Sequence, residues 1–275
     1  MPREPSSNLG FGKNMPEGDT LFRTAIVLNR ALAGGVVTRF EAAGPAVAGA
    51  PLIGRTVTGV SARGKNLLIN FDDGSALHSH LRMEGSWHVY RPGEPWQKPE
   101  RQARAVLGTE RYVAVCFNAP VVEWLTATGL ARHEGLAGLG PDLLAPDFDE
   151  SEAIKRLRSR NNQPIGEAIM RQDTVAGIGN VYKSEVLFLC GLNPFGPVSG
   201  LTDEALRGVV ERARRLMKAN LGGGDRVTRF RSDGARQWVY GRQDELCLKC
   251  GTRIQMRRQG EDGRSTYWCP ACQPE

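Results

Sequence analysis

The chain has 275 residues, of which 40% are hydrophobic and 24% charged, a composition typical of a globular protein with about two domains. No apolar run approaches the ~20 residues that span a bilayer, and residues 1–14 lack the pattern of a secretory signal, so we expect a cytoplasmic protein without a membrane role. The net charge is +6, and it is unevenly distributed: residues 151–275 carry 21 Lys or Arg against 14 Asp or Glu, whereas residues 1–150 carry 15 against 16. A basic second half favours a polyanionic partner, most commonly nucleic acid, although a merely solubilising surface is the alternative.

The stretch MPEGDT at residues 15–20 reads like the start of a protein, although fourteen residues precede it. Apolar residues then recur at helical spacing over residues 21–32, and glycines at 34 and 35 follow. Asp19 or Thr20 can cap such a helix. The sequence therefore predicts one helix close behind this second start.

Short runs rich in β-branched and aromatic residues dominate the segment from Val36 to about Arg132. They read RTVTGVS, NLLINF, ALHSHLRM and RYVAVCF, and DDG at 72–74 is a hairpin turn between two of them. This half is predicted to be a β-sandwich or barrel with one helix. His78 and His80 would share one strand face, where they would form either a second metal site or, as we favour, part of a polar site.

Residues 133–149 are rich in Gly, Pro and Asp without a sustained period, as expected of a linker, and helical patterns follow to about Asn220. One helix is predicted from about Asn180 to Gly191. Gly177 and Gly179 would form the turn into its N-terminus, where unpaired N–H groups and the helix dipole suit an anion. Asn180 would add a side-chain donor there. Such a turn often does no more than join helices, but in a basic half it is a candidate phosphate clamp.

The cysteines give the most specific pattern. Cys247 and Cys250, then Cys269 and Cys272, form two CxxC pairs separated by eighteen residues, the spacing of a four-thiolate zinc site. Because all four positions are filled by protein, the single zinc ion is predicted to be structural. The other two cysteines, at 116 and 190, lie in apolar runs and are predicted to be buried packing residues.

Arginines are concentrated in and before this cysteine segment. Their guanidinium groups could contact phosphates, although a solvated basic face is the simpler alternative. They are Arg226, Arg229, Arg231, Arg236, Arg242, Arg253, Arg257, Arg258 and Arg264.

Six stretches resemble, in order, those of the Fpg/Nei DNA glycosylases, and the resemblance extends from Met15 to Gln273. They are MPEGDT, GKNLL (64–68), HLRMEG (80–85), LGPDLL (139–144), QDTVAGIGNVYKSEVLF (172–188) and YGR followed by the two cysteine pairs. The resemblance implies an α+β enzyme that excises oxidised bases from double-stranded DNA and cuts the strand at the abasic site. The domains it implies are an extension (1–14), a catalytic β-sandwich (15–132), a linker (133–149), a helix–two-turn–helix DNA-binding domain (150–245) and a zinc ribbon (246–275).

The resemblance also implies that the nucleophile is the amine of Pro16, exposed by removal of the initiating Met. A terminal amine has a pKa near ~8 and a lysine ~10.4, so at pH ~7.5 roughly a quarter of the former is neutral against about a thousandth of the latter. With residues 1–14 attached, the Pro16 nitrogen is an amide and has no usable lone pair. We therefore expect translation to begin at Met15, with proteolytic maturation or a catalytically dead paralogue as alternatives.

Other residues acquire roles from the same resemblance. Glu17 matches the acid/base carboxylate, Lys65 the lysine that holds the phosphate flanking the lesion, and Arg264 the ribbon arginine that grips phosphates at the flipped nucleotide. Met83 matches the residue that fills the gap left by the extruded base, although its pattern alone would suggest a core position. Gly177, Gly179 and Asn180 match the DNA-contacting glycine turn.

Departures from the family pattern bear on the substrate. The RRFG-type loop with further wedge residues has no clear counterpart, position 20 is Thr rather than a second Glu, and GGDRVTRF (223–230) differs from the base-covering loop of the purine-specific branch. These differences favour the endonuclease VIII (Nei) branch and oxidised pyrimidines over oxidised guanine. We expect a monomer associated with the nucleoid. The alternative is a non-catalytic paralogue that binds damaged DNA and has a blocked N-terminus.

Overall fold

The computed structural model describes residues 16–275, so the predicted extension 1–14 lies outside the described residues. These residues form two compact units. The first unit holds Pro16 and Thr20–Ala137, and the second holds Glu17–Asp19 and Gly138–Glu275. The boundary after Ala137 falls inside the segment predicted to be a linker.

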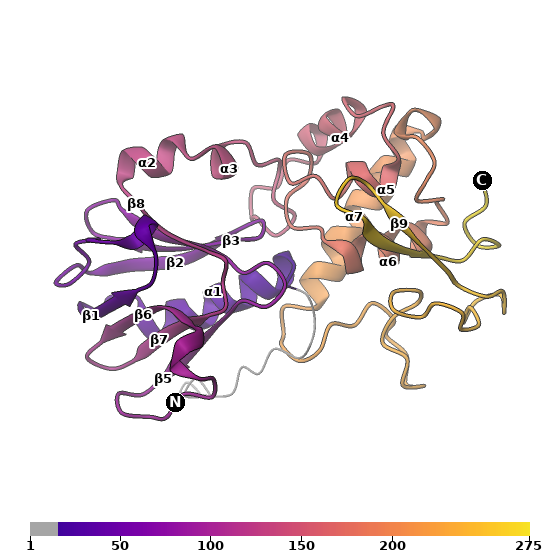
Figure 1. The fold of residues 1–275 in the computed structure, drawn as a ribbon. Helices are drawn as coiled ribbons and strands as arrows, with labels where there is room; N and C mark the ends of the chain where they lie inside the picture. The colour runs from indigo at the N-terminus through magenta and orange to yellow at the C-terminus, as the bar shows by residue number, and fades with distance from the viewer. Residues whose placement is uncertain (1–15) are drawn as a thin grey trace. The chain divides into compact units, whose positions relative to one another are not determined.

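The first unit is a β-sandwich of two four-stranded antiparallel sheets with one long helix, α1 (Gly18–Leu32), which begins in the second unit (Figure 1). One sheet has the order β1-β6-β7-β5, and its strands are β1 (Val37–Ala42), β5 (Ser86–Tyr90), β6 (Ala103–Thr109) and β7 (Val113–Phe117). The other has the order β2-β3-β4-β8, and its strands are β2 (Val57–Arg63), β3 (Asn66–Phe71), β4 (Ala76–His80) and β8 (Val121–Leu125).

The core of this unit lies between the two sheets and the apolar face of α1. Leu21 and Leu28 of the helix, Leu107 of β6 and Ile69 of β3 are all fully buried in one cluster. The helical spacing of the apolar residues therefore reflects burial of one face, as predicted. Two short helices end the unit, α2 (Ala127–Arg132) and α3 (Glu134–Ala137), and α3 lies within the predicted linker.

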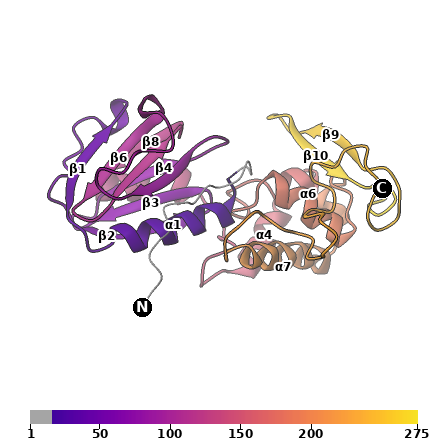
Figure 2. The same cartoon turned by 90° about the horizontal axis from the view of Figure 1, so that it is seen from below.

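The second unit is helical and carries a two-stranded ribbon beside α6 (Figure 2). Its helices are α4 (Glu150–Arg158), α5 (Ile165–Ala168), α6 (Asn180–Cys190) and α7 (Asp203–Ala219). The ribbon pairs β9 (Gln255–Gln259) with β10 (Arg264–Trp268) in antiparallel register. Short 3-10 turns occur at Pro45–Val47 and Glu100–Gln102 in the first unit and at Val198–Gly200 in the second. Among the described residues, no helix is long and apolar enough to cross a membrane.

The two cysteines outside the CxxC pairs differ from each other. Cys116 on β7 is fully buried, as predicted, and burial raises the pKa of its thiol above the usual range. Cys190, the last residue of α6, is only partly buried, so the prediction was wrong for that side chain. The end of a helix next to a left-handed glycine leaves it at the edge of the packed face.

Candidate active site and metal centre

Helix α6 begins at a glycine turn whose backbone requires glycine at one position. Gly177 has φ +108°, in the left-handed region that side chains rarely adopt. Gly179 has an ordinary φ of −123°, but a Cβ there would lie 2.4 Å from Cδ of Glu17. The turn therefore brings the backbone at Gly179 against the Glu17 carboxylate. At the other end, Gly191 closes the helix with φ +70°, as predicted.

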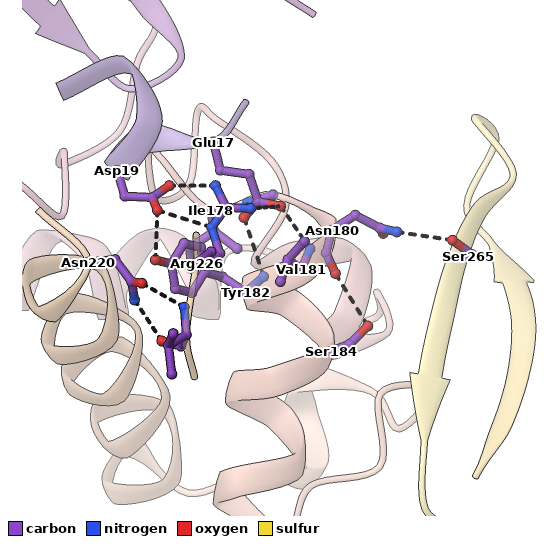
Figure 3. A network of polar contacts seen from close by, with 12 residues as sticks. Glu17, Asp19, Ile178, Asn180, Val181, Tyr182, Ser184, Asn220, Arg226 and Ser265 are labelled. Atoms are coloured by element: carbon purple, nitrogen blue, oxygen red, sulfur yellow. Dashed lines mark hydrogen bonds and ion pairs between the residues drawn. The ribbon is translucent and has the colours of Figure 1, made fainter. Parts of the chain in front are cut away.

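The Glu17 carboxylate occupies the N-terminus of α6 (Figure 3). It accepts hydrogen bonds from the backbone N–H groups of Gly179 (3.1 Å), Val181 (2.8 Å) and Tyr182 (3.3 Å), and the side chain is fully buried. The sequence pattern predicts that these donors are open to a DNA phosphate. They bind a carboxylate of the chain instead, because the free N–H groups and the helix dipole at this end stabilise any anion that reaches them.

A buried ion pair lies beside Glu17 (Figure 3). The guanidinium of Arg226 donates to both oxygens of Asp19, at 2.6 and 3.0 Å, and lies 3.8 Å from Glu17. Tyr182 donates its hydroxyl to Asp19 at 3.1 Å. Burial alone would lower the pKa of Arg226, but the Glu17 and Asp19 carboxylates raise it above its usual range. Arg226 is thus held inside the second unit, and its predicted phosphate contact is wrong.

Two side chains of α6 reach the ribbon. Asn180 donates to the Ser265 hydroxyl at 3.2 Å, and Lys183 donates to the Thr266 hydroxyl at 2.7 Å. Lys183 is 1% exposed, and burial is the main reason why its pKa is lowered to about 8. The nearby positive charge of Arg264 lowers it further, whereas the Coulombic attraction of Glu17 and Glu167 favours the charged form.

Glu185, further along α6, organises the chain that leads into the ribbon. Its fully buried carboxylate accepts hydrogen bonds from the N–H groups of Trp238, Val239 and Tyr240, each at 2.8 Å, and from the Thr228 hydroxyl. Three consecutive backbone donors around one carboxylate form an anion nest. Helix α6 therefore binds Glu17 at its N-terminus and, through Glu185, positions the segment that leads to the zinc-binding cysteines.

Arg264, the first residue of β10, lines a cavity of about 510 Å³ in the second unit together with Lys183. Its guanidinium lies 3.5 Å from Asp262, and its Nε is buried without a hydrogen-bond partner among the described residues. The side chain is about one-third exposed. The group therefore has donor capacity that its contacts within the described residues leave unused.

The four ribbon cysteines cluster as the spacing predicts. Their sulfur atoms all lie within 4.8 Å of one another, and the Cys247–Cys272 and Cys250–Cys269 pairs are 3.9 and 3.5 Å apart. Hydrogen bonds from Thr252 lower the pKa of Cys250 to about 6, whereas burial raises the pKa of Cys272. Four adjacent thiolates require a cation, and this donor set fits one tetrahedral zinc ion with no open position.

The first unit carries the other predicted residues. Lys65 lies in the turn between β2 and β3, close enough to His80 that its charge, after burial and Arg82, helps lower the pKa of that histidine to about 4. Met83 follows β4 and is 55% exposed, which excludes the core position that its pattern alone suggested. Arg82 beside it has φ +51°, an uncommon conformation for a residue with a side chain.

Three family models match the chain. They are the formamidopyrimidine-DNA glycosylase N-terminal domain at residues 15–120, the formamidopyrimidine-DNA glycosylase H2TH domain at 139–232, and the zinc finger found in FPG and IleRS at 244–274. The chain is 44% identical over 265 residues to a probable endonuclease 8 2 of Streptomyces coelicolor, covering 94% of each chain. It is 42% identical over 260 residues to the DNA-(apurinic or apyrimidinic site) lyase Nei2 of Mycolicibacterium smegmatis, covering 94% of this chain and 99% of the other.

The chain belongs to the Fpg/Nei family of DNA glycosylases. A solved structure of Lactococcus lactis Fpg non-covalently bound to DNA with an abasic site superimposes with a TM-score of 0.79 and 25% identity, over 94% of this chain and 100% of that one. The fold class, sandwich, helical domain and zinc ribbon predicted from the sequence are thereby confirmed.

The residues matched to Fpg/Nei motifs are divided between the units. In the second unit, Glu17, Gly177, Gly179 and Asn180 meet at the start of α6, and Arg264 lies on β10 next to Ser265, the partner of Asn180. In the first unit are Pro16, half-buried before Glu17, and Lys65 and Met83.

The buried charges that hold this Fpg/Nei site together are not predicted by the sequence pattern. Asp19 was considered only as a helix cap, yet α1 begins at Gly18 and the Asp19 carboxylate binds Arg226. The helical pattern assigns Lys183 and Glu185 no role beyond membership of the helix. Their signal is three consecutive polar residues, at 183–185, followed by the apolar run VLFL, which predicts buried charge when a helix is enclosed on all sides.

Proposed function

We propose that this protein is a bifunctional DNA glycosylase and AP lyase of base excision repair. The observation that carries the proposal is the buried Glu17 carboxylate, bonded to three N–H groups at the start of α6 and directly following Pro16 in the chain. Support also comes from relatives named endonuclease 8 and AP lyase Nei2, and from the Fpg structure bound to abasic-site DNA.

In this mechanism the amine of Pro16, freed from all preceding residues, attacks the sugar C1′ of a damaged nucleotide. The bond from C1′ to the base breaks, and the base leaves with the bonding electron pair. The Glu17 carboxylate takes the proton that the Pro16 nitrogen loses after the attack and delivers it to the ring oxygen, so the sugar opens to a cationic iminium that draws electrons from the neighbouring carbon. Loss of a proton from that carbon expels the 3′ phosphate and cuts the strand. Hydrolysis of the remaining iminium releases the enzyme.

Lys65, Arg264 and Asn180 are proposed to bind DNA phosphates, and Met83 to fill the space left by the extruded base. The exposure of Met83 supports this role, since a buried side chain could not enter a duplex.

The proposed substrate class is oxidised pyrimidines in double-stranded DNA, supported by the missing RRFG-type loop and by relatives named endonuclease 8. The protein is proposed to act as a monomer on the nucleoid in the cytoplasm. Zinc is structural and takes no part in the chemistry.

Borohydride trapping tests the proposal. A chain that begins at Pro16 should form a covalent adduct with abasic-site DNA in the presence of borohydride, and the same chain with residues 1–15 retained should not. Pro16→Gly keeps a terminal amine, now primary, and should retain part of the trapping. Intact mass spectrometry verifies each N-terminus.

The alternative, a non-catalytic binding paralogue, predicts no adduct from either form although both bind DNA. Trapping at equal rates by the verified long form would remove Pro16 as the nucleophile. Comparing release of an oxidised pyrimidine and an oxidised guanine from matched duplexes tests the substrate class, and faster release of the guanine would overturn it.

A further inference from the structure

A polar cluster lies in the first unit, away from the residues used above. Glu123 on β8 stands opposite His78 on the neighbouring strand β4, and His133 follows α2 as its C-cap. One oxygen of Glu123, Oε1, lies 2.7 Å from Nδ1 of His78 and 3.0 Å from Nε2 of His133. Two imidazole nitrogens from separate elements therefore converge on a single carboxylate oxygen.

The surroundings determine which nitrogen of His78 carries its proton. Asn66 donates its amide N–H to the carbonyl of Arg63 at 3.1 Å, which orients its Oδ1 toward the histidine. Nε2 of His78 lies 2.9 Å from that oxygen and must be the donor, because an amide oxygen accepts only. In a neutral ring Nδ1 then presents a lone pair to Glu123. In many metal sites a carboxylate accepts the hydrogen bond from the histidine nitrogen that does not bind the metal. Here the amide oxygen of Asn66 takes that place and orients the ring in the same way.

His133 has a simpler environment. Its Nε2 contacts Glu123, whereas its Nδ1 is buried without a hydrogen-bond partner among the described residues. His78 is 2% exposed, whereas about a quarter of the side-chain surface of His133 and Glu123 is exposed. The cluster is thus shielded on the His78 side and open to entry of a small ion on the other.

We propose that His78, Glu123 and His133 bind a divalent transition-metal ion, with Zn²⁺ the ion best suited to the donors. Two imidazoles and one carboxylate are a common three-ligand set for zinc, with a water in the fourth position. The three donor atoms lie within 4.8 Å of one another. Zinc bonds of about 2.0–2.2 Å place tetrahedral ligands roughly 3.3–3.6 Å apart, so small side-chain adjustments are enough. The ion supplies the positive charge that nitrogen lone pairs and a carboxylate oxygen need when they face one another.

This site is separate from the ribbon zinc and independent of the proposed glycosylase activity. The sequence pattern allows a metal site at His78 and His80, but His78 has other partners in the structure, and Nδ1 of His80 accepts the N–H of Arg82 instead. An ion held by β4, β8 and the end of α2 would cross-link the sheet to the segment that precedes the unit boundary at Gly138. Its role is therefore to fix the end of the first unit.

Metal stoichiometry of the full chain tests the proposal. After saturation with Zn²⁺ and removal of free ion by gel filtration, elemental analysis should give two zinc ions per chain. His133→Gln and His78→Gln should each give one. His88→Gln is the matched control, because His88 on β5 bonds to Ser86 and Tyr90 outside the cluster, and it should retain two.

Cobalt distinguishes the two sites by their spectra. The ribbon cysteines should give intense thiolate-to-cobalt absorption that saturates at one equivalent, and a second equivalent should add only weak ligand-field bands. Those weak bands should be lost in His133→Gln, which, being partly exposed, is expected to fold even if His78→Gln does not. One zinc ion per saturated wild-type chain would mean that His78, Glu123 and His133 are joined by hydrogen bonds without a metal ion. Two zinc ions in both His133→Gln and His78→Gln would place the second ion elsewhere. Either result overturns the proposal.

Discussion

Gly179 shows how a single residue can be required by its neighbour rather than by its own backbone. Its φ of −123° suits any amino acid, so Gly179→Ala adds a methyl group without backbone strain. That methyl would lie 2.4–2.7 Å from three atoms of Glu17 and would push the carboxylate from the start of α6. We expect the variant to lose most base excision and about 1–3 kcal/mol of stability, since the displaced carboxylate leaves buried N–H groups unpaired.

Urea unfolding and an excision assay measure these losses. Gly208→Ala is the matched control, because Gly208 lies inside α7 and a Cβ there meets nothing within 4 Å. It should raise the free energy of unfolding by about 0.5–1 kcal/mol and leave excision unchanged. If Gly179→Ala behaved like this control, Glu17 would not depend on the close approach.

Individual site residues can be predicted from the sequence where a local pattern specifies them, but not where a distant partner defines their role. The four zinc ligands follow from spacing alone, and Gly191 follows from its place at the end of an apolar helix. The contact between Glu17 and the N-terminus of α6 joins residues 162–165 positions apart, and Arg226 lies 207 positions from Asp19. No local pattern encodes such pairs. The helix N-terminus was correctly recognised as an anion site, but the anion proved to be internal.

Helix α6 carries a buried lysine, which gives the element a pH dependence. The pKa of Lys183 is lowered to about 8 by burial, below the ~10.4 of an exposed lysine. Above pH ~10.4 the lysine is neutral in the folded and unfolded states, so its burial costs no stability. As the pH falls toward about 8, the unfolded state binds the proton more readily than the folded state, and the free energy of unfolding decreases. The total change is about 3 kcal/mol. Lys183→Met removes this pH-dependent cost. The free energy of unfolding of the variant, relative to that of the parent, should therefore rise as the pH falls from about 10 to 8 and be constant below.

Urea unfolding of both proteins across this pH range provides the measurement. Lys155→Met on α4 is the control, since the Lys155 side chain is 81% exposed and its replacement removes no buried charge. A constant difference for Lys183→Met would mean that Lys183 titrates as an exposed lysine. Loss of the hydrogen bond to Thr266 shifts the whole curve without changing its slope.

At the scale of elements, the sequence predicted α1, α6 and the hairpin of β3 and β4 closely, because each combines a clear period with a glycine at its end. Strands β1, β5, β6 and β8 were not individually recognised. In β1 only Val37 is fully buried, and β5 mixes polar and aromatic residues, so their apolar periodicity is weak. Their place in the sheets depends on pairing partners far along the chain, such as β1 with β6.

The whole molecule is expected to bind DNA largely through charge. Lys65→Ala and Arg264→Ala should each weaken binding to abasic-site DNA and reduce the slope of log K against log salt by about one. Each effect would assign a DNA contact to its own unit, since the two residues belong to different units. Arg39→Ala is the control, because Arg39 is an exposed arginine of β1 paired with Glu41. Binding isotherms at several salt concentrations give the slopes, and unchanged slopes for both variants would remove these residues from the interface.

The ribbon gives the molecule a part whose fold depends on metal. Its hydrophobic cluster has five buried members, Phe188, Val239, Cys247, Ile254 and Cys269, and two of them are zinc ligands. Strands β9 and β10 have only five residues each, too few to be stable alone. Cys250→Ser should therefore lose the ribbon zinc, unfold β9 and β10, and reduce DNA affinity at least about tenfold through loss of the Arg264 contact.

Cys190→Ser is the matched control, since Cys190 is a partly exposed thiol outside the zinc cluster, and it should bind zinc and DNA like the parent. Hydrogen exchange measured by peptide mass spectrometry should show Cys250→Ser losing protection at residues 255–268 while β3 and β4 of the sandwich stay protected. The sandwich is expected to persist because its core in the first unit contains no residue of the ribbon. DNA binding by Cys250→Ser at the parent's affinity, with the ribbon unfolded, would show that the ribbon is not needed to hold DNA.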